Sequence, residues 1–488
     1  MSTKVPSGVG GPSEGPFNEA REAGVPPVGR TVGPTLTKVG FVSLGCPKNL
    51  VDSEVMLGAL TRHGYAITSN KEEADVLVVN TCGFIDSAKQ ESIDAILEMA
   101  ALKVHGNCKR LVVAGCLAER YRADIRKEIP EIDFVFGPDA LGEILKAVRI
   151  DEPNTDEISI DALYTSKEVP TIPRVLTTPP HMAYLKISEG CDHVCSFCAI
   201  PGFRGRFRSR SISALVEESR GLSEQGVREL VLVSQDTMAY GKDLGLPDGV
   251  TTLLRELAAI DGLHWIRFLY CYPHTISDEL VRLVAGEERL CKYFDIPYQH
   301  ASRTVLERMR RGGSRGLYER QIERIRRLNP SAGLRTSFIT GFPGETEADF
   351  QELLTFVNNV EFDNVGVFLY SDEEGTAAFD LDGKVPRRTA ARRRNQLMKR
   401  QNAISRKKLW TMVGRTMEVL LEGPSEESDL LLAGRTERQA PDIDGRVLIN
   451  DTGDRPVHIG KFYQVEITDS ADYDLIGRIV GTEASVPT

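Results

Sequence analysis

Three apolar runs of similar spacing constrain the fold of this chain most strongly. The runs VGFVSLGC, DVLVVNTC and RLVVAGC end at Cys46, Cys82 and Cys116, which stand 36 and 34 residues apart. Continuous Val and Leu runs bounded by Gly or Thr are typical of strands buried on both faces, and each spacing is about the length of one strand–helix–strand unit. Helix-like segments fill the intervals between the runs. We therefore predict a parallel α/β domain over residues 37–148.

The remaining sequence divides into four further regions by composition and pattern. Residues 1–36 hold seven Gly and six Pro without a hydrophobic period, which predicts a disordered leader, and the polar, Pro-containing residues 149–180 predict a linker. Between residues 181 and 410, six strand-like runs alternate with helical patterns, as in a full or partial parallel barrel. Residues 411–488 hold short runs spaced by Gly and Asp, which predict a small all-β, barrel-like domain.

The composition of the 488-residue chain is that of an ordinary globular protein, with 41% hydrophobic and 27% charged residues. No stretch approaches the roughly 18 apolar residues of a membrane helix, and the N-terminus lacks the charged-then-apolar pattern of an export signal. We therefore expect a cytoplasmic protein without membrane contact. Its nine cysteines should be reduced there, which favours metal or redox chemistry over disulfides.

The clearest chemical motif is C-x3-C-x2-C, formed by Cys191, Cys195 and Cys198 directly after the first strand of the predicted barrel. A structural zinc site normally uses four ligands, and no fourth Cys or His lies at a suitable nearby spacing, since His193 lies inside the loop itself. Three thiolates on a 4Fe-4S cluster leave one iron open, where a substrate can coordinate. The motif therefore predicts such a cluster rather than zinc.

The three cysteines of the N-terminal domain form a second candidate site. The carboxyl ends of parallel strands converge on one crevice, so cysteines that are far apart in sequence can meet there. The alternative is that they are buried small hydrophobic residues, a common role of Cys. The sequence geometry leaves both readings open. Cys108, Cys271 and Cys291 lack such placement and are expected to be core or incidental residues.

The chain resembles a known enzyme family at these residues. The C-x3-C-x2-C motif, with the aromatic Phe197 before its third cysteine, resembles the radical S-adenosylmethionine superfamily. Together with the three N-terminal cysteines and the C-terminal β-domain, it resembles the methylthiotransferases, and among these the RimO-type enzymes that modify a ribosomal protein. The resemblance covers nearly everything from Thr37 onward.

The resemblance implies two 4Fe-4S clusters. The open iron of the barrel cluster would bind the amino and carboxylate groups of S-adenosylmethionine, whose one-electron cleavage gives a radical able to abstract hydrogen from an unactivated carbon. The cluster at the N-terminal cysteines would hold the sulfur or methylthio group, and a second S-adenosylmethionine would donate the methyl group. A low-potential flavodoxin or ferredoxin is the implied electron source.

Two further loops are candidates for contact with the cofactor. The segment SQDT ends the second barrel strand and TGFPGE ends the fifth, and catalytic faces of parallel barrels are built from such strand ends. The glycine pair of TGFPGE resembles the superfamily's cofactor-cradling turn; the alternative is a plain tight turn that needs glycine. It is no Walker A loop, because the GK[ST] ending is missing. The candidate cofactor-binding residues are Phe197, Gln235, Asp236, Gly341 and Glu345.

Two features bear on the substrate, because the family divides into enzymes that modify a tRNA adenosine and enzymes that modify an aspartate side chain. The first cysteine lies in SLGCPKNLVDSE, which resembles the RimO form, whereas the tRNA-modifying relatives usually carry a glutamine where this chain has Pro47.

The C-terminal domain resembles the TRAM domain, an RNA-binding barrel that is usually basic. Here residues 411–488 hold 7 Lys and Arg and 15 Asp and Glu, a net charge of −8. That charge would repel RNA and attract a basic ribosomal protein; the alternative is an acidic solubility surface.

One basic segment favours an RNA substrate instead. Residues 384–408 hold eleven basic residues and no acidic one, and could line an RNA-binding face. More often such a run is a solvated helix, here with Leu397 and Ile404 packed inward. It could also touch ribosomal RNA beside the protein target.

We therefore expect a radical S-adenosylmethionine methylthiotransferase that adds a methylthio group to the β-carbon of an aspartate in small-subunit ribosomal protein twelve. The enzyme alternative is a tRNA adenosine methylthiotransferase. The non-enzyme alternative is an iron–sulfur electron-transfer or RNA-binding module. Formation of deoxyadenosine on reduction with S-adenosylmethionine separates an enzyme from a carrier.

Overall fold

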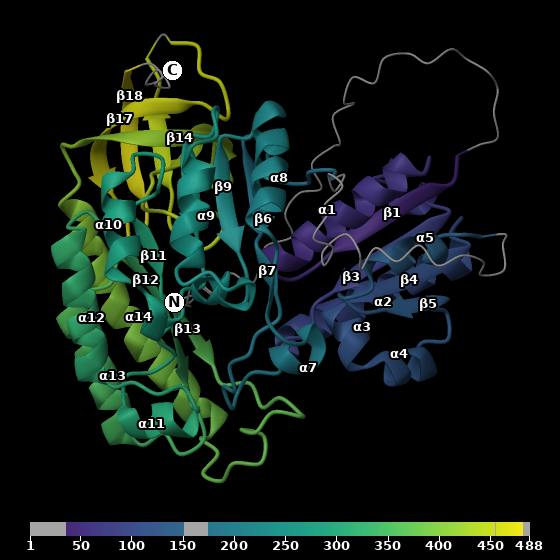
Figure 1. The fold of residues 1–488 in the computed structure, drawn as a ribbon, viewed down its shortest axis with the longest axis horizontal. Helices are drawn as coiled ribbons and strands as arrows, with labels where there is room; N and C mark the ends of the chain where they lie inside the picture. The colour runs from purple at the N-terminus through teal and green to yellow at the C-terminus, as the bar shows by residue number, and fades with distance from the viewer. Residues whose placement is uncertain (1–35, 151–173, 454, 482–488) are drawn as a thin grey trace, which may run out of the picture. The chain divides into compact units, whose positions relative to one another are not determined.

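The computed structural model describes residues 36–150, 174–453 and 455–481 (Figure 1). The described residues fall into two compact units, the first made of residues 36–150 and 174–175, the second of the residues from 176 onward. The leader expected over residues 1–36 lies outside the described residues except for its last position, and so does most of the expected linker. None of the described helices combines the length and the apolar character that a membrane crossing requires.

The first unit is built on a parallel five-stranded sheet with the strand order β2-β1-β3-β4-β5. Its central strands are the three apolar runs of the sequence, which pair side by side and are almost completely buried. The two outer strands, only three residues long, escaped the sequence prediction. The strands are β1 (Lys38–Ser43), β2 (Ala66–Thr68), β3 (Val76–Thr81), β4 (Arg110–Gly115) and β5 (Phe134–Phe136).

Helices connect these parallel strands, as a parallel sheet requires. The two long ones occupy the intervals in which the sequence shows helical patterns. The helices of the unit are α1 (Pro47–Arg62), α2 (Asp86–His105), α3 (Cys116–Arg120), α4 (Arg122–Glu128) and α5 (Ile144–Ala147), with 3-10 turns η1 (Lys71–Glu73) and η2 (Leu141–Glu143).

The second unit begins with six parallel strands in two groups, ordered β10-β9-β6 and β11-β12-β13. A parallel bridge between Ile266 and Leu290 joins the groups, so that the six strands form a partial barrel. All six coincide with strand-like runs of the sequence. They are β6 (Met182–Lys186), β9 (Glu229–Val233), β10 (Trp265–Phe268), β11 (Tyr293–Asp295), β12 (Gly333–Thr340) and β13 (Asn364–Leu369).

Helices cover the outside of this barrel and share one large apolar core with its strands. The helices of the barrel are α7 (Ile200–Arg204), α8 (Ile212–Glu224), α9 (Gly249–Ala258), α10 (Asp278–Gly286), α11 (Arg303–Arg308), α12 (Arg315–Leu328), α13 (Glu347–Val360) and α14 (Arg387–Trp410). A two-stranded ribbon, β7 (Ser188–Glu189) and β8 (Arg208–Ser209), and 3-10 turns η3 (Thr237–Ala239), η4 (Lys242–Leu244) and η5 (Pro273–Thr275) complete the region.

The C-terminal strands close into a separate small barrel with the order β14-β15-β16-β18-β17. The short runs TMEVLLEG, GRVLIND and KFYQVEITDS of the sequence coincide with β14, β16 and β17, whereas β15 and β18 were not predicted. The strands are β14 (Thr416–Ser425), β15 (Ser428–Arg435), β16 (Val447–Asp451), β17 (Phe462–Ser470) and β18 (Leu475–Gly481). The predicted fold class, a parallel α/β domain followed by a partial parallel barrel and a small all-β barrel, is confirmed.

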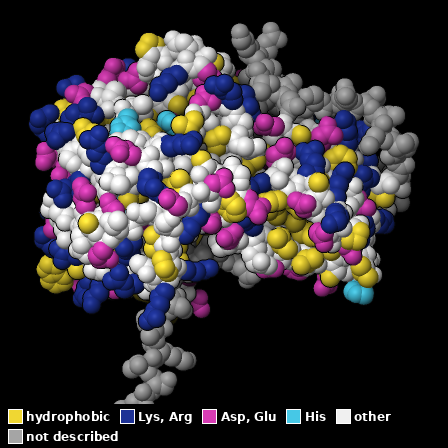
Figure 2. Space-filling model, turned by 90° about the horizontal axis from the view of Figure 1, so that it is seen from below, with side chains coloured by type: hydrophobic (Ala, Val, Ile, Leu, Met, Phe, Trp, Pro, Cys, Tyr) yellow, Lys and Arg dark blue, Asp and Glu magenta, His cyan; other side chains and the backbone are white. Residues whose placement is uncertain are grey.

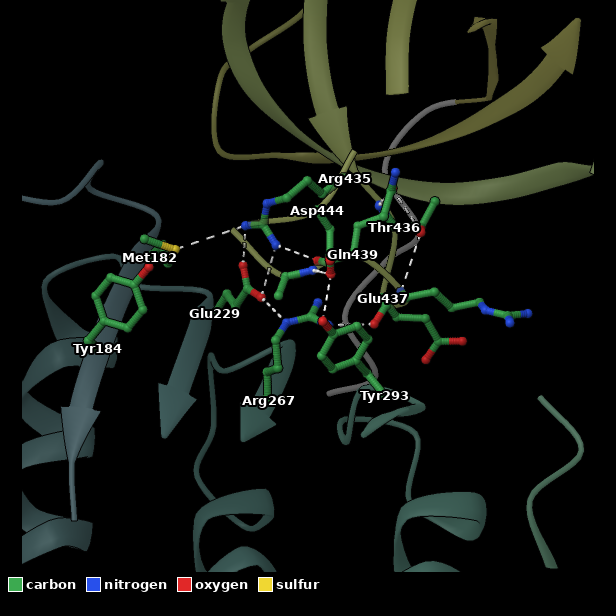
Figure 3. Close-up of polar contacts among 12 residues, drawn as sticks. Met182, Tyr184, Glu229, Arg267, Tyr293, Arg435, Thr436, Glu437, Gln439 and Asp444 are labelled. Carbon is green, nitrogen blue, oxygen red and sulfur yellow. Dashed lines mark hydrogen bonds and ion pairs between the residues drawn. The ribbon is translucent and has the colours of Figure 1, made fainter. Parts of the chain in front are cut away.

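Buried ion pairs fasten the small barrel to the amino ends of the large barrel's strands (Figure 3). Glu229, the first residue of β9, accepts hydrogen bonds from Arg267 Nε of β10 at 3.0 Å and from Arg435 Nη2 of β15 at 2.5 Å. The Tyr293 hydroxyl at the start of β11 donates to Asp444 Oδ2 of the small barrel at 2.6 Å. Glu229, Arg267 and Arg435 are at most 1% exposed. We call this contact region the seam.

Candidate functional site

The three cysteines of the first unit follow three adjacent strands. Cys46 caps α1 after β1, Cys82 directly follows β3, and Cys116 begins α3 after β4. Their loops approach closely: a Cβ on Gly45 would stand 2.6 Å from Cys82 Cβ, and one on Gly83 would stand 3.1 Å from the carbonyl carbon of Cys116. Since parallel strands end at the same edge, the structure places the three cysteines together at one end of the sheet.

A buried polar network fixes the loop that carries the first of these cysteines. Asn49 Nδ2 donates to the carbonyl of Leu44 at 2.7 Å and reaches the carbonyls of Asn80 and Thr81 at 3.4 and 3.3 Å. Asn80 Nδ2 in turn donates to Ser53 Oγ at 2.8 Å. These residues lie in or against the segment SLGCPKNLVDSE, so the segment has a physical role that the sequence did not reveal: it ties the end of β3 to the first cysteine loop.

The cysteines of C-x3-C-x2-C lie in the loop between β7 and α7, beyond the carboxyl end of β6, and all three are half-buried. The loop is anchored through Ser196, whose N–H donates to the carbonyl of Met309 at 2.9 Å and whose hydroxyl donates to the carbonyl of Arg308 at 2.8 Å. Burial raises the pKa of Cys191 to about 11 and that of Cys198 to about 12. Both thiols therefore hold their protons at neutral pH, and binding to metal must displace them.

The three thiols of this loop are the donors that an iron–sulfur cluster uses. Among the described residues, no three His, Cys, Asp or Glu side chains converge on a point where one metal ion could sit. A 4Fe-4S cluster needs thiolates that are further apart than the ligands of a single ion, because each thiolate binds its own iron and the sulfurs surround a larger group. Three thiols on one anchored loop meet that need.

Two candidate cofactor residues lie beside this loop. Asp236 Oδ2 is 2.7 Å from Nε2 of His193, the histidine between the first two cysteines. Gln235 Nε2 donates to Glu189 Oε1 at 2.8 Å, and its buried Oε1 has no hydrogen-bond partner among the described residues. Phe197, in contrast, is partly buried and packs against the barrel core.

The other two candidates, Gly341 and Glu345, make their contacts within their own turn and with α14. The Glu345 carboxylate accepts from the N–H of Gly341 and from that of Phe342 at 3.2 Å, and lies 3.3 Å from Arg393. Burial raises the pKa of Glu345 to about 7. Gly341 has a φ of +83°, and a Cβ there would stand 2.3 Å from Ala390 Cβ. The turn therefore needs glycine for structural reasons, and its contact with a cofactor stays a prediction.

The sequence prediction missed a buried charge cluster beside the cysteine loop. Glu189 Oε2 lies 2.8 Å from Lys186 Nζ and 3.0 Å from Arg204 Nη1. Burial by itself would raise the pKa of Glu189, but Arg204 and Lys186 hold it at about 2. The signal was present, since two charged residues interrupt the apolar run immediately before the motif. The sequence prediction also missed a group of three side chains that contact one another beside the cysteine loop. They are Arg311, Tyr272 and His193, and only the fold brings them together.

The remaining cysteines and two apolar residues of the basic run lie in the core. Cys108, Cys271 and Cys291 are at most 5% exposed and lie in the core, as expected. The basic run forms α14, and Leu397 and Ile404 are buried in it, which confirms the packing expected of a solvated helix. Several of its cations are paired with acids at the surface, among them Arg392 with Glu347 at 3.1 Å, Lys407 with Glu361 at 2.8 Å and Arg406 with Asp472 at 3.4 Å.

Charges of both signs also mix elsewhere on the surface. Figure 2 shows Lys and Arg side chains interspersed with Asp and Glu side chains over the face that it draws, with no large area of a single sign. This face therefore offers no extended basic surface of the kind that binds nucleic acid through its phosphates.

Three family models match the chain in order. The uncharacterized protein family UPF0004 matches residues 38–137, the radical SAM superfamily residues 185–357, and the TRAM domain residues 413–480. Similar curated proteins include "Ribosomal protein uS12 methylthiotransferase RimO" of Koribacter versatilis, 48% identical over 91% of this chain and 96% of the relative. The protein of the same name from Solibacter usitatus is 50% identical over 92% and 96%.

Among solved structures, the radical S-adenosylmethionine methyltransferase TsrM from Kitasatospora setae, with cobalamin and a [4Fe-4S] cluster bound, aligns with a TM-score of 0.51. The alignment covers 69% of this chain and 72% of TsrM at 14% sequence identity. At that identity the likeness concerns the fold alone.

Proposed function

The chain belongs to the RimO family of ribosomal protein uS12 methylthiotransferases, and on that premise we propose that it adds a methylthio group to the β-carbon of an aspartate in uS12. The observation that carries the proposal is the presence of two separate cysteine trios, one at the carboxyl ends of three parallel strands and the other on a single loop beyond the carboxyl end of β6. One trio would suffice for a simpler radical enzyme. A second trio suits an enzyme that must also hold the sulfur it transfers.

The barrel trio, Cys191, Cys195 and Cys198, would hold a 4Fe-4S cluster with one iron free for S-adenosylmethionine. Such a cluster, when reduced, supplies the electron that cleaves this cofactor. The protein's part is to bind and orient. Gln235 offers a buried carbonyl oxygen without a partner among the described residues, suited to the cofactor's amino group. Asp236 holds His193 and thereby the shape of the cysteine loop.

The N-terminal trio would hold the second cluster, which keeps the sulfur or methylthio group. The close packing of its three loops and the Asn49 network support this role, because a cluster site must be shaped before its metal is loaded. A second S-adenosylmethionine is the methyl donor. A low-potential flavodoxin or ferredoxin is the proposed reductant.

The substrate assignment is supported by charge and by the relatives' names. The C-terminal domain carries a net charge of −8, which suits a basic ribosomal protein better than tRNA. The pairing of α14 cations with surface acids weakens the case for an RNA-binding helix, although a limited contact with ribosomal RNA next to uS12 fits the proposal. A ribosomal substrate also fits a cytoplasmic enzyme.

The first test is anaerobic reconstitution of the full chain followed by iron and sulfide analysis. About eight of each per chain are expected for two 4Fe-4S clusters. About four would confine the cluster to one trio and contradict the proposed sulfur transfer. Zinc without iron would contradict the whole mechanism.

The second test separates the two trios. Cys82→Ala is expected to spare the reductive cleavage of S-adenosylmethionine to 5′-deoxyadenosine, yet to stop methylthiolation of uS12, as followed by mass spectrometry of the ribosomal protein. Normal product formation by Cys82→Ala would remove the second cluster from the mechanism.

A further inference from the structure

A stack of three side chains lies against the cysteine loop of the second unit. The rings of His193 and Tyr272 are nearly parallel, with centroids 3.8 Å apart and an interplanar angle of 11°. The guanidinium of Arg311 lies over the Tyr272 ring, 4.6 Å from its centroid. Because His193 belongs to the loop between Cys191 and Cys195, the stack joins that loop to the barrel.

The carboxyl ends of the barrel strands hold this stack in place. Asp236, which follows β9, lies 2.7 Å from His193 Nε2, and the Tyr272 hydroxyl, beyond β10, donates to the backbone carbonyl of Arg311 at 3.1 Å. Arg311 Nη2 donates to the carbonyl of Pro297, beyond β11, at 2.5 Å. The Arg311 guanidinium is therefore held by the Pro297 carbonyl and by the face of the Tyr272 ring, and the other two contacts hold His193 and the Arg311 backbone.

In that position Arg311 is a buried cation that no acid among the described residues balances. It is only 8% exposed, and a guanidinium stays charged in proteins. In the part of the chain that the structure describes, no carboxylate lies within ion-pair distance of it, and its Nε has no hydrogen-bond partner. Its Nη1 lies 3.6 Å from Cys195 Sγ. A buried charge is costly unless it is paired, so the site is suited to an anionic group bound at this sulfur.

We propose that Arg311 is a positioning residue that raises the reduction potential of the 4Fe-4S cluster held by Cys191, Cys195 and Cys198. The inference rests on the proposed function, because it requires that cluster. Reduction adds one electron from the flavodoxin or ferredoxin, and no bond or proton of Arg311 changes. A fixed positive charge and an N–H donor at the Cys195 sulfur stabilise the more negative, reduced form, since such contacts set the potentials of iron–sulfur clusters.

The test is a redox titration monitored by electron paramagnetic resonance. It uses the full chain with the three cysteines of the first unit replaced by Ala, so that the barrel cluster alone remains. At the parent's midpoint potential, Arg311→Gln should show a ratio of reduced to oxidised cluster about tenfold lower, which equals 59 mV for one electron. Arg311→Lys keeps the charge without the planar fork and should fall between the two. The exposed neighbour Arg310→Gln removes the same net charge and should titrate like the parent.

The outcomes separate a redox role from a structural one. An unshifted potential in Arg311→Gln would overturn the inference, as would an equal shift in Arg310→Gln. If Arg311→Gln loses its iron, Arg311→Lys decides: a lowered potential supports the inference, and an unchanged one assigns Arg311 a purely structural role. A parent protein that binds no iron at this site would instead contradict the proposed function itself.

Discussion

The two ends of the large barrel both bury charged side chains, but they balance those charges differently. At the amino end, Glu229 is held between Arg267 and Arg435, and Glu422 supplies a second acid 2.9 Å from Arg435. At the carboxyl end, the described residues give Arg311 a sulfur and a carbonyl oxygen as partners and no acid within ion-pair distance. Buried charge alone therefore does not mark a functional site. Buried cations that acids of the protein balance serve structure, and a buried cation without such an acid indicates that an anionic ligand balances it.

The largest expected effect on activity comes from replacing a cysteine by alanine at the carboxyl end of the large barrel, and the same replacement near its amino end is the control. Cys195→Ala should abolish cleavage of S-adenosylmethionine, because its sulfur is a proposed cluster ligand. Cys291→Ala, in the buried region close to the seam, should leave cleavage intact and lower the free energy of unfolding by about 1 kcal/mol, the cost of a small cavity. Product analysis for 5′-deoxyadenosine checks both. Normal cleavage by Cys195→Ala would show that the carboxyl end is not the cofactor site.

Breaking the seam should cost stability and spare the cluster. Arg435→Ala leaves the Glu229 charge buried with one partner fewer, and removing one member of such a network costs about 3–5 kcal/mol. Urea unfolding followed by tryptophan fluorescence measures this, because Trp265 lies at the seam, 4.9 Å from Phe462 between ring centroids. The matched control is Arg446→Ala, whose partly exposed pair with Glu426 should be worth less than about 1 kcal/mol. Equal losses in both variants would contradict a structural seam.

Acid should weaken the seam through His181. Burial, with the nearby Arg435 charge, lowers the pKa of His181 from 6.5 to about 4. Between these values the unfolded chain binds a proton that the folded chain does not, so stability falls as the pH drops from about 6.5 toward 4, by about 3 kcal/mol in all. His181→Gln should remove this part of the pH dependence, while the exposed His458→Gln should retain it. Parallel curves of unfolding free energy against pH for the parent and His181→Gln would refute the assignment.

The smallest expected effect concerns the turn at Gly341, at the carboxyl end of the large barrel, which can have a structural role alone or can also bind the cofactor. Gly341→Ala should destabilise the protein by about 1–3 kcal/mol, because its φ of +83° strains other residues and the new methyl group meets Ala390. We expect that the turn also contacts the cofactor and that Gly341→Ala therefore raises the KM for S-adenosylmethionine as well. Gly375→Ala, with a φ of +78° and open space around it, is the control for strain alone. An unchanged KM in Gly341→Ala would leave the turn a structural role only.

Much of the fold could be predicted because its signals are local. The central strands of the first sheet are continuous apolar runs, and the six strands of the large barrel are short runs rich in apolar and β-branched residues, so each can be recognised from its own sequence. β2 and β5 were missed because three residues at a sheet edge carry too little pattern. β18 contains Gly477, which lies against Val465 and obscures the strand pattern in the sequence.

The sequence by itself determined the central strands of the first sheet and the six strands of the large barrel, and it singled out the six candidate ligand cysteines, because strand periodicity and cysteine spacing are properties of neighbouring residues. Only the tertiary structure decided which partner each buried charged side chain has. Glu229 and Arg435 are 206 residues apart, and Arg311 reaches Cys195 across 116 residues. Such pairings depend on which strand ends lie side by side, and no local pattern encodes that.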